Sequence, residues 1–237
     1  MSPGSLALLA RSAAALALAL LAVAGIAWAA RQPRFDLHRI EVRGDLRHVS
    51  RAQVRSAIAG RAAGGWFTVR LDRVRAAFET IPWVAAASVR RVWPDRLEVE
   101  LVERRAVGAW DDGRLLAQEG VLFAGNADEA ELDGPQVQFS GPPGYAPLAG
   151  AGLAGWKSAL AAMGTNLAAV EISERGSWTL RAGSGQVIEL GRDDPPGTLG
   201  QRLSKVAASY PVVVAQVGGA PARIDARYGN GFTVSGP

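Results

Sequence analysis

The residue types that perform acid–base or metal chemistry are scarce in this chain. Its two histidines, His38 and His48, fall on an expected strand and an expected loop, where a histidine is more often a surface or packing residue than a catalyst. The chain has no cysteine, which excludes disulfides, thiol catalysis and thiolate metal sites. It also lacks a Gly-x-Ser-x-Gly elbow, a His-Glu-x-x-His pair and a phosphate-binding Gly-Lys-Ser/Thr loop. We therefore expect no catalytic residue, cofactor or metal.

Several carboxylates stand in turn or loop contexts, where contact with solvent is the default interpretation. They are Asp111, Asp112, Glu129, Glu131, Asp193 and Asp194. The run Asp-Asp-Pro-Pro-Gly at 193–197 is typical of the lead-in to a helix, with acid near the positive end of the helix dipole. No third ligand is evident near it, so a metal site is not expected there.

One nucleotide-binding motif matches by letter, since residues 150–155 read Gly-x-Gly-x-x-Gly. Glu171 and Glu174 follow at roughly the distance of a ribose-binding acid. A dinucleotide fingerprint needs a preceding buried strand inside a βαβ unit. The preceding residues 141–147 contain too much Pro and Gly to form that strand. We interpret the match as chance in a chain rich in Ala and Gly.

The basic residues do not indicate nucleic-acid binding. Arginine supplies almost all of the 26 basic residues, and only Lys157 and Lys205 are lysines. The arginines concentrate within residues 31–114, where many stand beside Asp or Glu. That region would present mixed charge rather than a continuous phosphate-binding stripe, so neither DNA nor RNA is an expected partner.

Residues 12–30 contain no charge and predict a transmembrane helix. At 1.5 Å per residue this run nearly matches a hydrocarbon core of about 30 Å. The alternative is a cleaved signal peptide, because Arg11 precedes an apolar run that ends in a small-x-small site, Ala27-Trp28-Ala29. The run is longer than a signal-peptide core of about 7 to 15 residues, which favours the membrane anchor. Cleavage stays open as the alternative.

The charges that flank this helix do not decide its orientation. Arg11 lies on one side, and Arg31, Arg34 and Arg39 lie on the other, so the positive-inside rule gives no support for a cytoplasmic N-terminus. We nevertheless expect a cytoplasmic N-terminus, because residues 1–11 are too few to form a domain that would be translocated across the membrane.

After the transmembrane helix, the sequence predicts elements in the order strand, helix, helix, strand, strand. The first strand is expected at residues 37–43, and Ser50 with Gln53 forms a capping box that opens the first helix. The second helix has one apolar stripe and ends at Pro82. That stripe is made by Leu71, Val74, Phe78 and Ile81. Around the turn Trp93-Pro94-Asp95, period-two alternation predicts a hairpin with one buried face.

From residue 107 onward the pattern changes to short strands separated by glycine turns. Asp112-Gly113 and residues 183–185 each mark a hairpin. Residues 134–155 are expected to form a loop, followed by a helix at 156–163. A later helix at 198–210 is expected to stop at Pro211. This second domain is therefore predicted to be mainly β with a late helix.

The last predicted strand, residues 223–228, is the candidate binding element. Alternation places Arg223, Asp225 and Arg227 on one face and Ile224, Ala226 and Tyr228 on the other. A terminal strand is often an edge strand, whose unpaired backbone groups accept a partner strand. The alternative is that Tyr228 packs into the core and Arg227 is only solvated.

The first domain resembles the POTRA domain of the FtsQ/DivIB family of bacterial cell-division proteins. The motifs that carry the resemblance are Val42-x-Gly44, Val49-Ser50, Trp66-Phe67-x-Val69, Pro82-Trp83-Val84 and Val89-Arg90-Arg91-x-Trp93-Pro94-Asp95-x-Leu97. Glu103, a short linker and a strand ending at Trp110 continue it.

The second domain resembles the β domain of the same family. Its motifs are Glu174-Arg175-Gly176-Ser177-Trp178-Thr179-Leu180, Leu190-Gly191-Arg192, residues 203–211 and Arg223-Ile224-Asp225-Ala226-Arg227-Tyr228. The implied fold is a single N-terminal transmembrane helix, then an α+β POTRA domain (βααββ), then a mainly β domain with a late helix. The expected boundaries are a short cytoplasmic head at 1–11, the helix at 12–30, the POTRA domain at 35–104 and the β domain at 105–237.

The resemblance implies a non-enzymatic divisome scaffold. Such a protein is a single-pass inner-membrane protein with its bulk in the periplasm, concentrated at the septum, where it recruits FtsB and FtsL and supports control of septal peptidoglycan synthesis. Its POTRA domain would contact other divisome proteins. The residues carried over as the FtsB site are Arg175, Arg227, Tyr228, Gly229, Asn230 and Gly231. Some members have an acid and a Ser where this chain has Gly229-Asn230, so backbone pairing rather than side-chain contact is expected there.

Two other functions remain as alternatives. A membrane-tethered POTRA chaperone of protein transport would hold unfolded strands on the free sheet edge at residues 37–43, although such proteins usually carry repeated POTRA units or precede a β-barrel. A periplasmic enzyme acting on the cell wall would need a nucleophile or metal site that the sequence does not offer.

Overall fold

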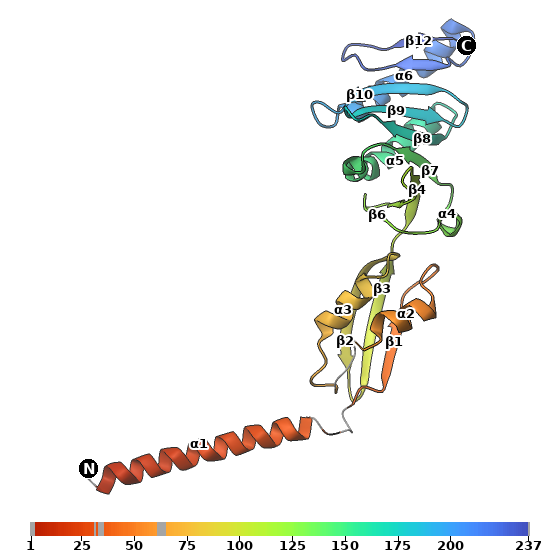
Figure 1. Ribbon diagram of the computed structural model, residues 1–237. Helices are drawn as coiled ribbons and strands as arrows, with labels where there is room; N and C mark the ends of the chain where they lie inside the picture. The colour runs from red at the N-terminus through yellow and green to blue at the C-terminus, as the bar shows by residue number, and fades with distance from the viewer. Residues whose placement is uncertain (1–2, 31, 33–35, 61–64, 237) are drawn as a thin grey trace. The chain divides into compact units, whose positions relative to one another are not determined.

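The computed structural model describes residues 3–30, 32, 36–60 and 65–236 (Figure 1). The chain divides into two compact units, Met1–Glu103 and Arg104–Pro237. The first contains the apolar helix and a small α/β module, and the second contains a large sheet with two long helices.

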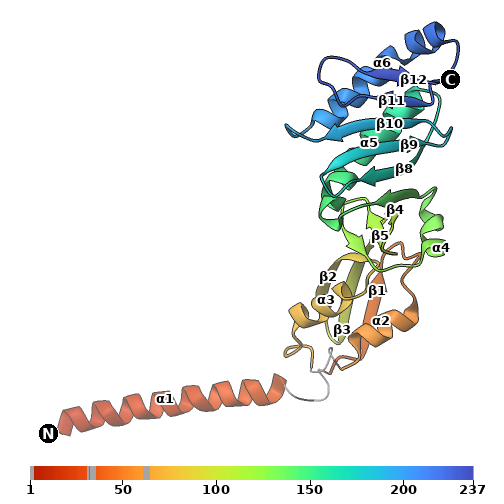
Figure 2. The ribbon, with the colours of Figure 1, turned by 45° about the horizontal axis from the view of Figure 1, so that its top comes forward.

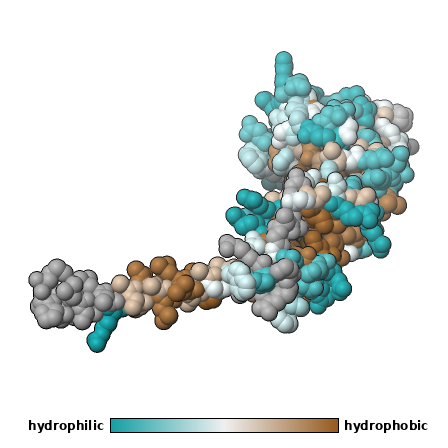
Figure 3. Space-filling view, turned by 60° about the horizontal axis from the view of Figure 1, so that its bottom comes forward, coloured by the Kyte–Doolittle hydropathy of each residue, from teal (hydrophilic) through white to brown (hydrophobic). Residues whose placement is uncertain are grey.

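The N-terminal helix α1 spans Pro3–Ala30. Its segment Arg11–Trp28 is long and apolar enough to cross a membrane, and no part of that segment is buried in the structure. Figure 3 shows an apolar surface, brown to beige, along the part of the helix that follows the grey atoms. The helix therefore agrees with the predicted membrane span by length and composition. A signal sequence meets the same criteria, so cleavage remains an untested alternative.

The α/β module has the predicted order of elements. They are β1 Arg39–Arg43, α2 Arg51–Ile58, α3 Leu71–Glu79, β2 Val84–Val92 and β3 Arg96–Glu103. The sheet order is β1-β3-β2, with β1 parallel and β2 antiparallel to β3. The first strand is shorter than expected and begins at Arg39, and before it Asp36 forms an isolated β-bridge with Gly65.

Local signals in the sequence explain why these elements form. The Ser50 side chain accepts the Gln53 backbone N–H, and the Gln53 side chain accepts the Ser50 N–H, which completes the predicted capping box. The predicted stripe of α3 faces the sheet, where Val74 and Phe78 are fully buried. The other side chains of this core include Val69, Ile81, Trp83, Leu97, Val99 and Leu101.

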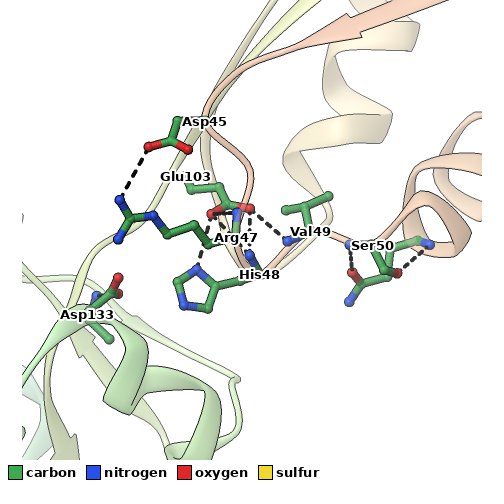
Figure 4. Close-up of polar contacts among 9 residues, drawn as sticks. Asp45, Arg47, His48, Val49, Ser50, Glu103 and Asp133 are labelled. Carbon is green, nitrogen blue, oxygen red and sulfur yellow. Dashed lines mark hydrogen bonds and ion pairs between the residues drawn. The ribbon is translucent and has the colours of Figure 1, made fainter.

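A buried carboxylate fixes the loop between β1 and α2 (Figure 4). Glu103, at the end of β3, accepts backbone N–H groups of Arg47 at 2.9 Å, His48 at 3.1 Å and Val49 at 2.7 Å. The His48 Nδ1 lies 3.1 Å from the same carboxylate, and the imidazole stacks on Trp83 at 3.9 Å. Only 8% of the Glu103 side chain is exposed. Burial raises the pKa of Glu103, but the hydrogen bonds from Arg47, Val49 and His48 outweigh it and bring the pKa below its ordinary value of 4.5.

The second unit is built on a nine-stranded sheet of order β12-β11-β10-β9-β8-β7-β4-β5-β6. Its strands are β4 Ala106–Trp110, β5 Leu115–Ala117, β6 Leu122–Phe123, β7 Val137–Ser140, β8 Leu167–Ile172, β9 Ser177–Ala182, β10 Val187–Arg192, β11 Arg223–Asp225 and β12 Thr233–Ser235. Its helices are α4 Ala127–Ala130, α5 Ala146–Ala162 and α6 Thr198–Val217, with two short 3-10 turns at Glu131–Asp133 and Pro143–Tyr145. Helices α5 and α6 lie side by side on one face of the sheet (Figure 2).

The core of this unit lies between the sheet and those two helices. Trp178 of β9 is its largest fully buried side chain, and the rings of Trp156 and Tyr145 lie 5.4 and 5.8 Å from it. Strand β9 alternates strictly between buried and less buried residues, which is typical of a sheet with one covered face.

Two predicted elements in this unit are wrong. The expected loop at 134–155 contains β7 and most of α5, because the Ala-rich run after Pro147 forms a helix once its apolar face packs on the sheet. Helix α6 does not stop at Pro211 but continues to Val217. A proline removes one hydrogen bond without forbidding the turns that follow it. The helix ends at Gly218, whose φ of +79° suits a C-cap and whose N–H donates to the Val214 carbonyl.

The structure rejects a dinucleotide site at the Gly-x-Gly-x-x-Gly match, but for a different reason from the missing strand that the sequence suggested. Strands β7 and β8 are parallel neighbours joined by α5, so a βαβ unit does exist there, contrary to expectation. The three glycines, however, lie inside α5 rather than in the turn between a strand and a helix. A phosphate site needs the free N–H groups of a helix N-terminus, which residues in the middle of a helix do not offer.

Gly108 of β4 provides a test of this packing. A Cβ added there would overlap the Phe139 ring and the Val137 carbonyl of the neighbouring strand β7. We expect Gly108→Ala to lower the free energy of unfolding by about 1 to 3 kcal/mol in urea unfolding followed by tryptophan fluorescence. The control is Gly200→Ala in α6, which meets no atom within 4 Å and should stabilise the protein by about 0.5 to 1 kcal/mol. Equal effects of the two changes would contradict the packing of β4 on β7.

Candidate partner-binding site

Strand β12 forms one edge of the large sheet, and it pairs antiparallel with β11. The predicted edge strand at 223–228 is therefore wrong in two respects. Only Arg223–Asp225 form a strand, and that strand lies between β10 and β12. The turn after Tyr228 returns the chain, so Thr233–Ser235 cover β11. The β-branched pair Thr233-Val234 after a Gly-Asn-Gly turn is compatible with a strand, but three residues are too few to predict one.

The register shows which backbone groups of β12 point outward. The Val187 N–H donates to the Ala222 carbonyl at 3.0 Å and the Ala226 N–H donates to the Glu189 carbonyl at 2.8 Å, so Ile224 between them directs its own backbone groups to β10. Backbone groups alternate in direction along a strand, so Arg223 and Asp225 face β12 and bond to their partners Ser235 and Thr233. The N–H and C=O groups of Val234, opposite Ile224, consequently point away from the sheet, toward its open edge.

Tyr228 lies on the surface beside this edge. Its side chain is 60% exposed, which excludes the interpretation that it packs into the core. The residues after it, Gly229, Asn230 and Gly231, form the turn that the sequence predicts. The ammonium group of Lys205 on α6 donates to the Gly229 carbonyl at 3.0 Å, so the helix holds this turn.

Arg227 is oriented by Asp225. Its Nε and Nη2 donate to the two carboxylate oxygens at 2.9 and 2.6 Å, and its backbone N–H donates to the same carboxylate at 3.1 Å. Glu189 of β10 lies 3.4 Å from the same guanidinium. The hydrogen bond from Arg227 lowers the pKa of Asp225, and the one to Asp225 raises the pKa of Arg227. Most of the Arg227 charge is therefore already neutralised within the protein.

The fold brings Arg175 and Arg227 together at one hollow of about 540 Å³. Arg175 comes from the turn before β9, and Arg227 follows β11. The hollow is also lined by Arg192 at the end of β10 and by Arg202 of α6, two residues that the sequence analysis did not select. No short motif joins these segments, so no sequence signal could have grouped them.

A bulge in β10 shapes this hollow. The pairing of β10 with β9 shifts register between Glu189 and Gly191, and Gly191 has a φ of +75°. A side chain at Gly191 would also contact the Arg227 side chain at 3.2 Å. Glycine is therefore needed here both for the bulge and for the close passage of Arg227.

The charge of the hollow is positive. Within the described part of the chain, Arg175 and Arg192 form no ion pair. Arg202 donates its Nη1 to the Leu190 and Arg192 carbonyls at 2.6 and 2.8 Å, bonds that leave its charge unneutralised. Asp194 is the acid of the lining. This arrangement suits a carboxylate that arrives with a partner.

The acids expected to lead into α6 do so. The Leu199 N–H donates to the Asp193 carboxylate at 3.2 Å at the start of the helix. Among the residues that the structure describes, no group of three His, Cys, Asp or Glu side chains is placed to hold a metal ion.

Comparison with known families gives this geometry its context. The family described as POTRA domain, FtsQ-type, matches residues 35–104, and the family described as cell division protein FtsQ/DivIB, C-terminal, matches residues 108–227. The chain belongs to the FtsQ/DivIB family. Its α/β module is the POTRA domain, and the sheet of the second unit is the FtsQ/DivIB C-terminal domain.

Similar FtsQ proteins cover most of the chain. The cell division protein FtsQ of Burkholderia pseudomallei is 39% identical over 220 residues, which are 93% of this chain and 87% of that protein. FtsQ of Bordetella pertussis is 34% identical over 96% of this chain and 89% of its own length. FtsQ of Vibrio cholerae is 29% identical over 88% of this chain and 78% of its own length.

Membership in the FtsQ/DivIB family supports a role in the divisome. Together with the apolar helix α1, it suggests a single-pass inner-membrane protein. The family match ends at Arg227, so Tyr228, the turn and β12 lie beyond it.

Proposed function

We propose that this protein is a non-enzymatic scaffold of the division machinery that holds FtsB, with FtsL, by strand addition to β12. The observation that carries the proposal is the position of β12. It lies at the edge of the sheet next to exposed Tyr228, and the basic hollow follows on the neighbouring strands. Edge pairing supplies main-chain hydrogen bonds, and side-chain pockets beside the edge supply specificity.

The charge of the hollow supports a partner segment that carries an acid. Arg175, Arg192 and Arg202 line it, whereas the charge of Arg227 is largely neutralised by Asp225. We therefore assign Arg227 the task of fixing the surface beside Tyr228 and assign Arg175 the ion pair with the partner. In the turn, Gly229, Asn230 and Gly231 contribute backbone groups.

The proposed topology follows from the same assignment. Residues 1–11 form a cytoplasmic head, residues 12–30 span the inner membrane, and the POTRA domain at 35–104 and the β domain at 105–237 lie in the periplasm. At the septum the scaffold would hold the regulators of septal peptidoglycan synthesis in place. The POTRA domain would contact further divisome proteins.

One observation keeps the transport-chaperone alternative in view. Strand β1 lies at the edge of the POTRA sheet, as strand capture by a chaperone requires. A pulldown enriched for outer-membrane precursors rather than division proteins would favour that function.

The test of the scaffold is a pulldown of FtsB and FtsL from detergent-solubilised membranes with the full chain. Tyr228→Ala is expected to reduce capture by about 5- to 30-fold, since an exposed aromatic anchor beside an edge strand contributes about 1 to 2 kcal/mol. The thermal stability of the Tyr228→Ala variant should equal that of the wild type, because Tyr228 is 60% exposed.

The matched control is Val212→Ala on α6, where Val212 is 59% exposed and should not affect capture. Equal capture by wild type and Tyr228→Ala would contradict the proposed site. Failure of the wild type to capture either partner would contradict the scaffold itself.

A further inference from the structure

Two exposed aromatic side chains lie at one end of the POTRA domain. Trp93 in the turn between β2 and β3 is 69% exposed, and Phe67 in the loop before α3 is 49% exposed. We call the segments 36–38, 65–67 and 93–95 the proximal end. Asp36 forms a β-bridge with Gly65, and the His38 N–H donates to the Asp95 carbonyl at 3.1 Å. The aromatic residues therefore flank the point where the chain arrives from α1.

Hydrogen bonds hold this end in shape. The Trp66 Nε1 donates to the Val92 carbonyl at 3.2 Å, and its ring packs edge-to-face on Phe67 at 4.9 Å. The Arg91 guanidinium donates to the Trp66 and Val69 carbonyls at 2.8 Å each. Exposed rings on a fixed backbone lose little conformational freedom when they bind a surface.

The distance from this end to the apolar helix is limited by the chain itself. Helix α1 ends at Ala30, and Asp36 already belongs to the proximal end. The five residues 31–35 between them reach about 20 Å when fully extended. If α1 spans the bilayer, the proximal end lies within about 20 Å of the point where the chain leaves it, close to a headgroup layer of several Å per side.

The charged groups of the proximal end do not by themselves require an anionic surface. Arg39 and Arg91 are exposed there, but so is Asp36, and the Asp95 carboxylate lies 3.9 Å from the His38 ring. These groups nearly balance, although the connecting segment 31–35 also contains Arg31 and Arg34. Trp and Phe, in contrast, favour the interfacial layer of a bilayer whatever its charge, because an amphipathic or apolar ring gains from partial burial there.

We propose that the proximal end is a lipid-binding patch, in which Trp93 and Phe67 enter the headgroup layer of the leaflet that α1 leaves. The patch holds the POTRA domain against the bilayer. This contact restricts the orientation of the POTRA domain relative to the membrane, and with it the directions in which the edges of the POTRA sheet can face. The proposal rests on α1 spanning the membrane and is independent of the binding of FtsB.

The test uses the full chain in vesicles of phosphatidylcholine that contain a doxyl-labelled lipid quencher. The absence of native cysteine permits single labels with an environment-sensitive fluorophore. Asp95→Cys places a label at the proximal end. Asp45→Cys is the matched control beyond the other end of β1, and Ala22→Cys reports the span of α1. We expect strong quenching at residue 95 by a shallow quencher, little at residue 45, and quenching at residue 22 by a deep quencher.

The aromatic rings are then removed in the Asp95→Cys background. Trp93→Ser with Phe67→Ser should reduce quenching at residue 95 several-fold, whereas Trp93→Phe should retain most of it. The quenching should not require added phosphatidylglycerol, because the aromatic rings rather than the basic residues enter the headgroup layer. Circular dichroism checks that each variant is folded.

Three outcomes would overturn the lipid-binding patch. They are equal quenching at residues 45 and 95, quenching at residue 95 that persists in the folded double-serine variant, and absence of quenching at residue 22. The last would also show that α1 does not span. A partner protein as the true ligand would leave residue 95 unquenched, since the vesicles contain lipid alone.

Discussion

Val234→Pro is expected to reduce capture of FtsB by about 30- to 1,000-fold relative to Val234→Ala, without breaking a hydrogen bond of the sheet. The Val234 N–H points toward the open edge of β12, where an added strand would accept it. Proline removes this donor, and its ring meets the incoming carbonyl. A lost hydrogen bond together with an unsatisfied carbonyl costs about 2 to 4 kcal/mol.

The matched substitutions separate strand addition from general damage. Val234→Ala keeps the N–H, so it measures the loss of the side chain alone. Ser235→Pro removes a donor that bonds inward to β11, so it should lower the thermal stability of the domain more than Val234→Pro does. The measurement is titration of the full chain with FtsB, with thermal unfolding of each variant beside it. Binding by Val234→Pro that equals binding by Val234→Ala would contradict strand addition to β12.

Glu103→Ala is expected to destabilise the POTRA domain by about 3 to 5 kcal/mol. The change leaves the N–H groups of Arg47, His48 and Val49 and the His48 imidazole without the carboxylate that they share. Removal of one partner from a buried, charged network typically costs this much. Hydrogen exchange of these amides should accelerate, and the fluorescence of Trp83, which stacks on His48, should change.

The same carboxylate gives the stability a pH dependence of known sign. Its pKa in the folded protein lies below the ordinary value of 4.5, so the unfolded state binds the proton more tightly. The stabilisation from Glu103 is therefore fully present above about pH 4.5 and is lost as the pH falls through the lower, folded pKa. Glu103→Gln should remove this part of the acid dependence.

Glu100→Gln is the control for both measurements. Glu100 is exposed on the same strand, so the free energy of unfolding of the Glu100→Gln variant should stay within about 0.5 kcal/mol of the wild type. A Glu103→Ala variant as stable as this control would show that the carboxylate does not fix the loop.

The POTRA domain could be predicted almost completely from sequence because its signals are local. A capping box begins α2, an apolar stripe with period 3.6 defines α3, and alternation defines β2 and β3. Each signal lies within the element that it specifies, so no knowledge of distant contacts is needed.

The second unit was harder to predict because its elements are stabilised by contacts with distant residues. The Ala- and Gly-rich α5 has no strong helix signal of its own, and it forms where β7 and β8 leave a face to be covered. Strand β12 has three residues, too few to recognise without β11 beside it. Packing, rather than propensity, decides such elements.

The candidate site divides in the same way. The sequence by itself predicted which segments would carry it, since Arg175, Arg227 and Tyr228 stand in motifs that resemble the family, although Gly229-Asn230 departs from some members. Only the tertiary structure decided that Tyr228 is exposed, that β12 rather than β11 forms the edge, and that Arg192 and Arg202 join Arg175 at one hollow. The physical reason is that a sheet edge and a hollow are made by strands and helices far apart in the chain, and their positions follow from burial of the shared core.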